Sequence, residues 1–350
     1  MSFDKLNELL KDNGVDINDA VKTISNFQSG KIKPIETSLE HLNKATFGGL
    51  IPGMVLSIGA RPSMGKTHTL HQLKNDILNK KDRNISMLLY NWEMPWFSLI
   101  LIQLKKALKK SFHEILHNQP TEFELQHYKD VMEKFRDSRL TTVSKPLTPE
   151  EWNYLTREWI EKNLDKEILI VAIDHLGIVV GDDKTKSIYK LMEYENAIKL
   201  DYPSKVVFIN LFQLNRQIEA IWRAKDTNPV GLRVTSEYIF SADSIMQYSD
   251  IVMAQVIPER ANMEKYASVN RERYKHLEEH FADDSNTTSE YVRLKGTNRI
   301  YYDYIKRRLP EDDESNLYAD ILNREKEEFI RATSSKERDY TDFDDDELNF

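Results

Sequence analysis

The chain has 350 residues, of which 40% are hydrophobic and none is cysteine, and its formal net charge is −8. This length suits one large α/β domain with extensions, or at most two domains. The lack of cysteine excludes disulfides, thiolate metal sites and cysteine nucleophiles, and the lack of any run of about eighteen apolar residues argues against a membrane span.

The negative charge is concentrated at one end of the sequence. Fifteen acidic and five basic side chains lie between Glu311 and Phe350, so residues 1–310 are nearly neutral. A neutral body neither requires nor forbids a nucleic-acid partner. The polar stretch from Met1 to Lys5 has no apolar signal region. We therefore expect a cytoplasmic protein, in the host cell if a phage encodes it.

Residues 1–36 are predicted to form a short helical segment and a linker. Apolar residues recur at helical spacing in 3–11, and 17–27 is a second candidate helix. The helix over 3–11 packs either on the core of its own chain or on a neighbouring subunit. Residues 28–35 are polar and contain glycine and proline, a composition typical of a linker.

From residue 54 onwards, short apolar runs alternate with helical patterns. The apolar runs predict strands over 54–58, 85–90, 140–143, 168–173, 206–211 and 251–257. The helical patterns predict helices over 66–79 and 98–110, from 149 onwards, and over 187–200. This alternation predicts an α/β fold with a mostly parallel sheet flanked by helices, in a domain over 37–310.

The start of the third of these helices carries three local signals. Thr148 is a favoured capping residue, Pro149 suits the first helical position, and Glu151 completes a capping box. The sequence therefore predicts a helix that begins at Pro149.

Three later segments depart from the alternation. Residues 259–290 are charged and are predicted to be an insertion that is partly mobile. The apolar runs 291–294 and 300–305 are predicted to pair as a hairpin. Residues 311–350 are predicted to be an acidic, disordered tail.

A phosphate-binding loop is predicted between the first apolar run and the first long helix. The consensus is glycine, four residues, then Gly-Lys-Ser/Thr; here Ala60 stands at the first glycine, and Gly65, Lys66 and Thr67 match the rest. Backbone N–H groups of such a loop and the following helix N-terminus bind phosphate. Lys66 is predicted to reach the outer phosphates of ATP and Thr67 to ligate Mg²⁺. The predicted nucleotide contacts are Gly59, Ala60, Arg61, Pro62, Ser63, Met64, Gly65, Lys66, Thr67 and His68.

Three polar residues follow predicted strands. Asp174 ends the run 168–173, and we expect it at the sheet edge as a second Mg²⁺ ligand, unless it only caps a turn. Glu93 follows 85–90, and it either accepts a proton from the attacking water or is a solvated turn residue. Gln213 follows 206–211, and it either senses the terminal phosphate or is a loop amide bonded to backbone.

Taken together, these motifs resemble those of the DnaB-like hexameric replicative helicases, in their C-terminal RecA-like motor domain. The resemblance runs from about Thr37 to Arg307, and it is carried by Gly59–Thr67, Trp92–Pro95, Ile173–Leu176, Gln213–Arg216 and the helix start Leu147–Pro149. It implies a ring of six subunits around single-stranded DNA, with ATP between subunits and hydrolysis driving the DNA-binding loops along the strand. The chain is thus expected to be an ATP-dependent DNA helicase of a replication system, in a phage version.

The segment that resembles the family's DNA-binding loop is 239–250. Here Ile245, Gln247 and Asp250 match the family. Phe240, Ser241 and Asp243 replace an arginine, a glutamate and a glycine. Basic residues in the preceding segment are predicted to contact DNA phosphates instead, unless they form only a solvated loop. These residues are Arg216, Arg223, Lys225 and Arg233.

A Lys-x-Arg pair in the family implies a cation that reaches into the neighbouring subunit's ATP site. This sequence keeps Lys295, has Thr297 at the arginine position, and offers Arg299 two residues later. Lys295 and Arg299 are therefore predicted to stabilise charge on the transferring phosphoryl group. The alternative is a charged hairpin tip without a catalytic role.

The acidic tail resembles the tails of phage helicases and single-strand-binding proteins. It is predicted either to dock a polymerase, primase or single-strand-binding partner, with Phe350 in a pocket, or only to keep the protein soluble. Two other functions share the same core. One is a RecA-type recombinase that coats DNA, and the other is an ATP-switched replication scaffold or loader that does not unwind.

Overall fold

The computed structural model describes residues 24–46, 48–223, 233–283, 289–308 and 316–321. The helix predicted over 3–11 lies outside these residues, as does most of the one over 17–27. The described end of the second is helical, over 24–28.

Eight strands form the main sheet. Their bounds are Val55–Ala60 (β1), Ile85–Asn91 (β2), Leu140–Val143 (β3), Ile168–Asp174 (β4), Val206–Gln213 (β5), Ile251–Val256 (β6), Arg299–Arg307 (β9) and Leu317–Ile321 (β10). Their order across the sheet is β10-β9-β6-β1-β5-β4-β2-β3. The six strands from β6 to β3 are parallel, and β9 runs antiparallel to both β6 and β10.

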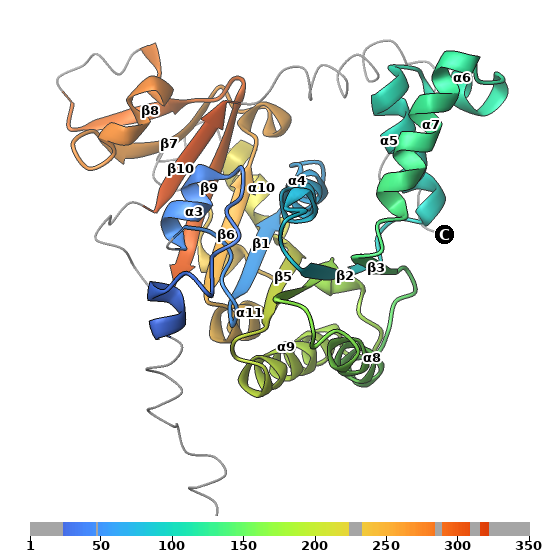
Figure 1. Cartoon of the computed structure of the whole chain (residues 1–350). Coiled ribbons are helices and arrows are strands. Elements are labelled where there is room, and N and C mark those ends of the chain that lie inside the picture. The colour runs from blue at the N-terminus through green and yellow to red at the C-terminus, as the bar shows by residue number, and fades with distance from the viewer. Residues whose placement is uncertain (1–23, 47, 224–232, 284–288, 309–315, 322–350) are drawn as a thin grey trace, which may run out of the picture.

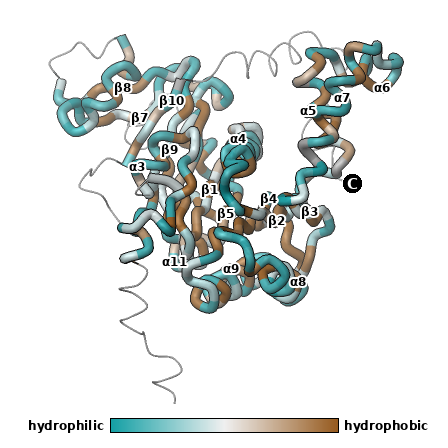
Figure 2. The backbone as a smooth tube through the Cα atoms, in the orientation of Figure 1, coloured by the Kyte–Doolittle hydropathy of each residue, from teal (hydrophilic) through white to brown (hydrophobic). Residues whose placement is uncertain are grey.

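The central strands are buried on both faces because their sequences are almost continuously apolar. Every residue of β1, β2, β4 and β6 is buried, and these strands form a hydrophobic band in Figure 2. The sequence prediction of a mostly parallel sheet flanked by helices is confirmed.

Helices cover both faces of the sheet (Figure 1). One face carries α4 (Lys66–Asn79), and the other carries α8 (Pro149–Glu161), α9 (Lys184–Asp201) and α11 (Ala242–Tyr248). Shorter helices are α3 (Glu40–Ala45) and α10 (Gln217–Arg223). The capping box predicted at Thr148 and Glu151 is present. No helix among the described residues is long and apolar enough to cross a membrane.

A helical arm extends from the sheet between β2 and β3 (Figure 1). It consists of α5 (Trp96–Leu108), α6 (Phe112–His117) and α7 (Glu122–Phe135). Only the first of these was predicted. The arm has a small core of its own, in which Leu104, Ile115 and Val131 are buried.

The predicted hairpin of 291–294 with 300–305 is wrong. Strand β8 (Tyr291–Lys295) instead pairs with β7 (Lys265–Asn270) in a separate two-stranded sheet, while β9 pairs with β6 and β10. The apolar run of β9 is buried because it lies between two strands of the main sheet. The segment predicted as an insertion therefore contributes an ordered strand, in which Tyr266 and Val269 are buried.

The boundary predicted for the acidic tail also needs correction. Leu317–Ile321 forms β10, which pairs with β9 along five residues. Leu317 and Tyr318 are buried in the main core, so these residues belong to the sheet although they follow an acidic stretch. Residues 322–350 lie outside the described part of the chain.

Candidate nucleotide-binding site

The phosphate loop joins the end of β1 to the start of α4. Ser63 and Gly65 have left-handed backbone conformations, with φ of 61° and 79°. A Cβ on Gly65 would lie 2.9 Å from Gln255 Nε2, and one on Gly59 would lie 2.2 Å from the Phe212 ring. Both the backbone and its neighbours therefore require glycine at Gly65. The predicted nucleotide contacts are contiguous at this turn: Gly59, Ala60, Arg61, Pro62, Ser63, Met64, Gly65, Lys66, Thr67 and His68.

Four predicted side chains meet at the carboxyl edge of the sheet. Thr67 Oγ1 donates to Asp174 Oδ2 at 3.0 Å. Lys66 Nζ lies 3.8 Å from Glu93 Oε2. Lys66 and Asp174 are buried, whereas the Glu93 side chain is 38% exposed. Strands β1, β4 and β2 end at this edge, which brings residues from distant parts of the sequence together.

Burial changes the acid–base behaviour of two of these groups. It raises the pKa of Asp174 to about 7; the Lys66 ammonium opposes this shift, and the Glu93 carboxylate adds to it. Burial also lowers the pKa of Lys66, against the effect of Asp174 and Glu93. Desolvation penalises each charged form. The site thus holds buried negative charge that a bound cation would stabilise.

The oxygen atoms at this point fit Mg²⁺. Asp174 Oδ1 is buried and has no hydrogen-bond partner among the described residues, and the Thr67 hydroxyl lies beside Oδ2. Mg²⁺ is commonly held by one or two protein oxygens together with substrate phosphates and water. The described residues contain no group of three or more His, Cys, Asp or Glu placed to hold a metal alone. Thr67 and Asp174 therefore suit a metal that is shared with nucleotide phosphates.

Gln213, the last residue of β5, contacts His175, which directly follows β4. The Gln213 side-chain amide lies 3.2 Å from His175 Nε2, and His175 Nδ1 accepts from the Gly177 N–H at 3.1 Å. Burial lowers the pKa of His175 to about 3, and Lys66 acts in the same direction. The neutral ring therefore carries its proton on Nε2 and donates it to the Gln213 amide oxygen, with that amide oriented to accept. His175 was not predicted as a site residue.

The family comparison agrees with this geometry. A model of the DnaB-like helicase C terminal domain matches residues 34–290, which is more than half of the chain. This chain belongs to the DnaB-like helicase C-terminal domain family.

Curated relatives of this DnaB-like domain are replicative helicases by name. Replicative DNA helicase DnaB of Buchnera aphidicola subsp. Schizaphis graminum (strain Sg) is 26% identical over 220 residues, which cover 61% of this chain and 45% of that protein. Replicative DNA helicase DnaB of Helicobacter pylori (strain ATCC 700392 / 26695) is 26% identical over 191 residues, covering 54% and 38%. The chain spans less than half the length of these relatives.

Solved structures show the same fold. The ATPase domain of a phage helicase superposes with a TM-score of 0.61 at 19% identity, covering 89% of this chain and 97% of that one. A DnaB-like replicative helicase, described with its interactions with primase, superposes with a TM-score of 0.57 at 20% identity, covering 88% and 64%. These likenesses support the RecA-like ATPase fold of the DnaB-like domain.

Gln255, which the sequence prediction missed, positions the phosphate loop of this DnaB-like domain. It is buried on β6, next to β1. Its Oε1 accepts from Thr69 Oγ1 at 2.6 Å, and its Nε2 donates to the Met64 carbonyl. A polar side chain inside an otherwise apolar strand was the available signal, because a buried amide needs partners.

Replacing Gln255 with Leu should loosen the phosphate loop. The change leaves the Thr69 hydroxyl and the Met64 carbonyl without their partner, a loss of about 1–3 kcal/mol of stability, and we expect ATP affinity to fall several-fold. Calorimetric titration with ATP and urea unfolding measure the two effects. Gln126→Leu, on the exposed surface of α7, is the matched control. Unchanged ATP affinity in Gln255→Leu would remove the positioning role.

Arg61 ties the phosphate loop to the segment after β5. Its guanidinium is paired with Glu219 of α10, with Nε donating at 2.6 Å, and it also donates to the Leu214 carbonyl at 2.7 Å. Arg260 donates to the Ser63 carbonyl from the other side of the loop. These contacts indicate that Arg61 has a structural role in the loop in addition to the predicted nucleotide contact.

Lys295 and Arg299, predicted to act on a neighbouring subunit, lie at the end of β8 and the start of β9. Lys295 is partly buried, and Arg299 donates to the Glu279 carbonyl at 3.4 Å. Within the described residues, neither has a recorded contact with the phosphate loop of its own chain. This placement leaves a role in another subunit as the form in which the prediction stands.

The predicted DNA contacts differ in how free their side chains are. Arg216 is exposed, and Arg223 is exposed but paired with Glu219 at 2.9 Å. Arg233 is mostly buried and pairs with the buried Asp303 at 2.7 Å, with further bonds to residues 274 and 316. Arg233 thus holds the fold together and is withdrawn as a phosphate contact. Lys225 lies outside the described residues.

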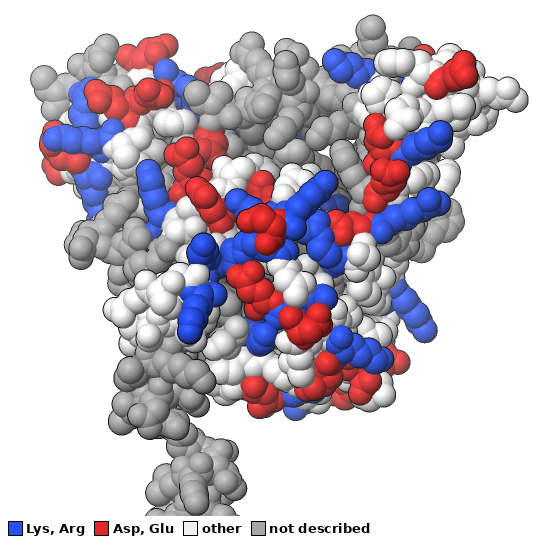
Figure 3. All heavy atoms as spheres, in the orientation of Figure 1, with Lys and Arg blue, Asp and Glu red and all other residues white. Residues whose placement is uncertain are grey.

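The face of the molecule shown in Figure 3 has acidic and basic side chains interspersed, without one sign prevailing. A nucleic-acid site on this DnaB-like domain must therefore be sought in a local feature.

Proposed function

We propose that this chain is the motor of an ATP-dependent DNA helicase, which forms a ring, moves on single-stranded DNA and unwinds duplex DNA in replication. The observation that carries the proposal is the meeting of Lys66, Thr67, Glu93 and Asp174 at one edge of the sheet. Membership of the DnaB-like family and relatives named replicative DNA helicases support it.

Each residue has a distinct role in ATP hydrolysis under this proposal. Lys66 neutralises charge on the outer phosphates, and Thr67 and Asp174 hold Mg²⁺, which supplies further neutralisation when bound. Glu93 accepts the proton of the attacking water. Glu93 suits this role better than Asp174, because its carboxylate is partly exposed to solvent whereas that of Asp174 is buried.

Gln213 and His175 connect the terminal phosphate to the rest of the motor. Gln213 ends β5 beside the phosphate loop, and the N–H of the next residue, Leu214, donates to the Ala60 carbonyl at 3.0 Å. A shift of the Gln213 amide on hydrolysis therefore acts on the chain that follows β5.

A neighbouring protomer is proposed to complete the site with Lys295 and Arg299. A cation at the transferring phosphoryl group stabilises charge that develops during hydrolysis. Both residues lie apart from their own phosphate loop, and a closed ring, proposed to be a homohexamer, gives each ATP site such a neighbour.

The acidic segment beyond residue 321 is proposed to dock a basic surface of a polymerase, primase or single-strand-binding protein. Its excess of acidic side chains and its terminal Phe350 support this, and one similar structure is described as a DnaB-like replicative helicase with its interactions with primase. A replication motor of this kind works in the cytoplasm, that of the host for a phage protein.

Strand separation on a forked duplex tests the proposed function. We expect single-stranded DNA to stimulate ATP hydrolysis several-fold, ATP to drive strand separation, and electron microscopy with nucleotide to show closed rings. Open filaments that pair strands would assign the chain to the recombinases. ATP hydrolysis that ignores DNA and separates no strands would assign it to the scaffolds or loaders and defeat the helicase proposal.

A further inference from the structure

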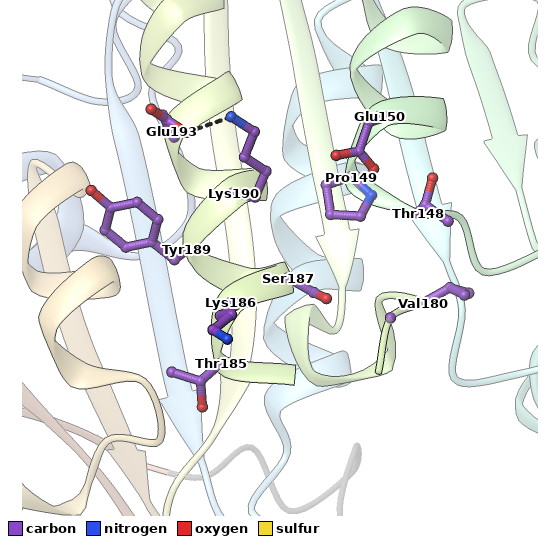
Figure 4. Close-up of a pocket in the computed structure, with 11 residues that line it drawn as sticks. Thr148, Pro149, Glu150, Val180, Thr185, Lys186, Ser187, Tyr189, Lys190 and Glu193 are labelled. Carbon is purple, nitrogen blue, oxygen red and sulfur yellow. Dashed lines mark hydrogen bonds and ion pairs between the residues drawn. The ribbon is translucent and has the colours of Figure 1, made fainter. Parts of the chain in front are cut away.

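Two cavities on the described surface differ in their charge. The larger, of about 660 Å³, lies between the starts of α8 and α9 (Figure 4). Its lining includes the acidic Glu150 and Glu193, and Lys190 is neutralised by Glu193 at 2.9 Å. The smaller, of about 460 Å³, lies beside the end of β5, and none of the residues that line it is acidic. The smaller cavity is therefore the one that suits an anionic ligand.

The smaller cavity combines exposed cations with an apolar floor. Arg216 and Lys184 are exposed on its lining, and Leu176, Ile188 and Ile245 supply buried apolar surface. Its volume lies in the range of small-ligand sites. The two surfaces are those needed to hold a phosphate group and a flat apolar ring at the same time.

Phe240 is an aromatic side chain of this cavity that is left 49% exposed. The segment that carries it, residues 239–250, contains Asp243 and Asp250 but no lysine or arginine. This segment cannot attract phosphate by charge. Its contribution to binding a nucleic acid must come from the ring.

We propose that Phe240 stacks on a base of single-stranded DNA in this cavity, while Arg216 contacts the adjoining phosphate. This inference rests on the proposed function and adds the mode of strand recognition. Aromatic stacking beside a basic rim is how single strands are held without sequence preference, because every base offers a flat face.

The position of Phe240 also links the base to the nucleotide. Ile239, the residue before Phe240, forms a bridge with Leu214, and the Asn215 N–H donates to the Tyr238 carbonyl at 2.7 Å. Leu214 in turn donates to the Ala60 carbonyl of the phosphate loop. Gln213 lines the same cavity. A movement of the phosphate loop is thus transmitted through one hydrogen-bonded strand end to the stacking ring.

Strands with and without bases separate stacking from charge. The probe is a fluorescent oligothymidylate, compared with an abasic deoxyribose-phosphate strand of the same length, over a range of salt concentrations. Phe240→Leu should weaken oligothymidylate binding by roughly 5- to 100-fold, with an unchanged salt slope and no effect on the abasic strand. Arg216→Gln should weaken both strands and lower the salt slope by about one.

Phe240→Trp guards against a folding artefact. We expect it to bind oligothymidylate like the wild type, with a fluorescence quench that the abasic strand does not produce. Equal losses on both strands in Phe240→Leu, or no loss, overturn the stacking proposal while leaving the helicase proposal intact. A changed assembly size with unchanged DNA affinity would assign the cavity to a neighbouring protomer and also overturn it. A wild type that binds neither strand overturns both proposals.

Discussion

Lys66→Ala should lower the rate of ATP hydrolysis by on the order of 100- to 1,000-fold, the loss seen when one fixed group that stabilises transition-state charge is removed. Lys66 begins α4 at the end of the phosphate loop, is buried, and lies 3.8 Å from Glu93. Its ammonium is the cation that the described part of this chain places among the two catalytic carboxylates. Alanine leaves Glu93 and Asp174 without it, so nucleotide affinity should fall as well.

Steady-state hydrolysis and calorimetric ATP titration measure the two effects of Lys66→Ala. Lys81→Ala is the control, because Lys81 is exposed just beyond the same helix and its charge is equal. The folded state of each variant is checked by its thermal unfolding. Hydrolysis by Lys66→Ala within a few-fold of the wild type would show that the phosphates bind elsewhere.

The core of the fold was predictable because its signals are local. The helix predicted over 66–79 and the strand over 140–143 have the observed bounds, and Thr148 caps its helix as expected. In each case a continuous apolar run or a capping pattern identifies the element without knowledge of its neighbours.

The arm was missed because its helices are short and pack only on each other. Its core of Leu104, Ile115 and Val131 has too few residues to give a long periodic pattern. Two capping boxes, which begin at Ser111 and Thr121, were available as signals.

Strand pairing failed for a different reason. The runs that became β8 and β9 are adjacent in sequence, which favours a hairpin. Tyr266 and Val269 of β7 provide the partner of β8 instead, across a gap in sequence. A partner chosen from outside the local window leaves no trace in the spacing of apolar residues.

The same division applies to the candidate site. Lys66, Thr67 and Asp174 were predicted because each lies at the end of a strand or the start of a helix that the sequence shows. Gln255 and His175 were not, because their roles depend on which strands lie beside β1 and β5. Sheet order is a property of the whole fold.

Glu195→Gln should remove a pH-dependent weakness in the core. Glu195 lies on α9, fully buried, and its Oε2 accepts from Asn210 Nδ2 of β5 at 2.7 Å. Burial raises the pKa of Glu195 from its usual 4.5 to about 8, and the bond to Asn210 opposes this. Glu195 Oε1 and Asn210 Oδ1 have no partner among the described residues, and a protonated carboxyl supplies the donor that Asn210 Oδ1 lacks.

The sign of the effect follows from the two pKa values of Glu195. The folded protein keeps the proton up to about pH 8, whereas the unfolded chain releases it near pH 4.5. The stability that Glu195 contributes is therefore complete below pH 4.5 and falls by about 1.4 kcal/mol per unit as the pH rises towards 8. The glutamine variant has no proton to lose, so it should gain on the wild type by about 3 kcal/mol between pH 5.5 and 8.

Urea unfolding at pH 5.5, 7 and 8 measures this gain. Glu193→Gln is the matched control, because Glu193 lies on the same helix but is exposed and paired with Lys190, and it should show almost no pH dependence relative to the wild type. A difference between Glu195→Gln and wild type that stays constant from pH 5.5 to 8 would mean that Glu195 is ionised in the folded core. The core would then have to supply a compensating cation at Glu195, where the described residues show only the Asn210 amide as its hydrogen-bond partner.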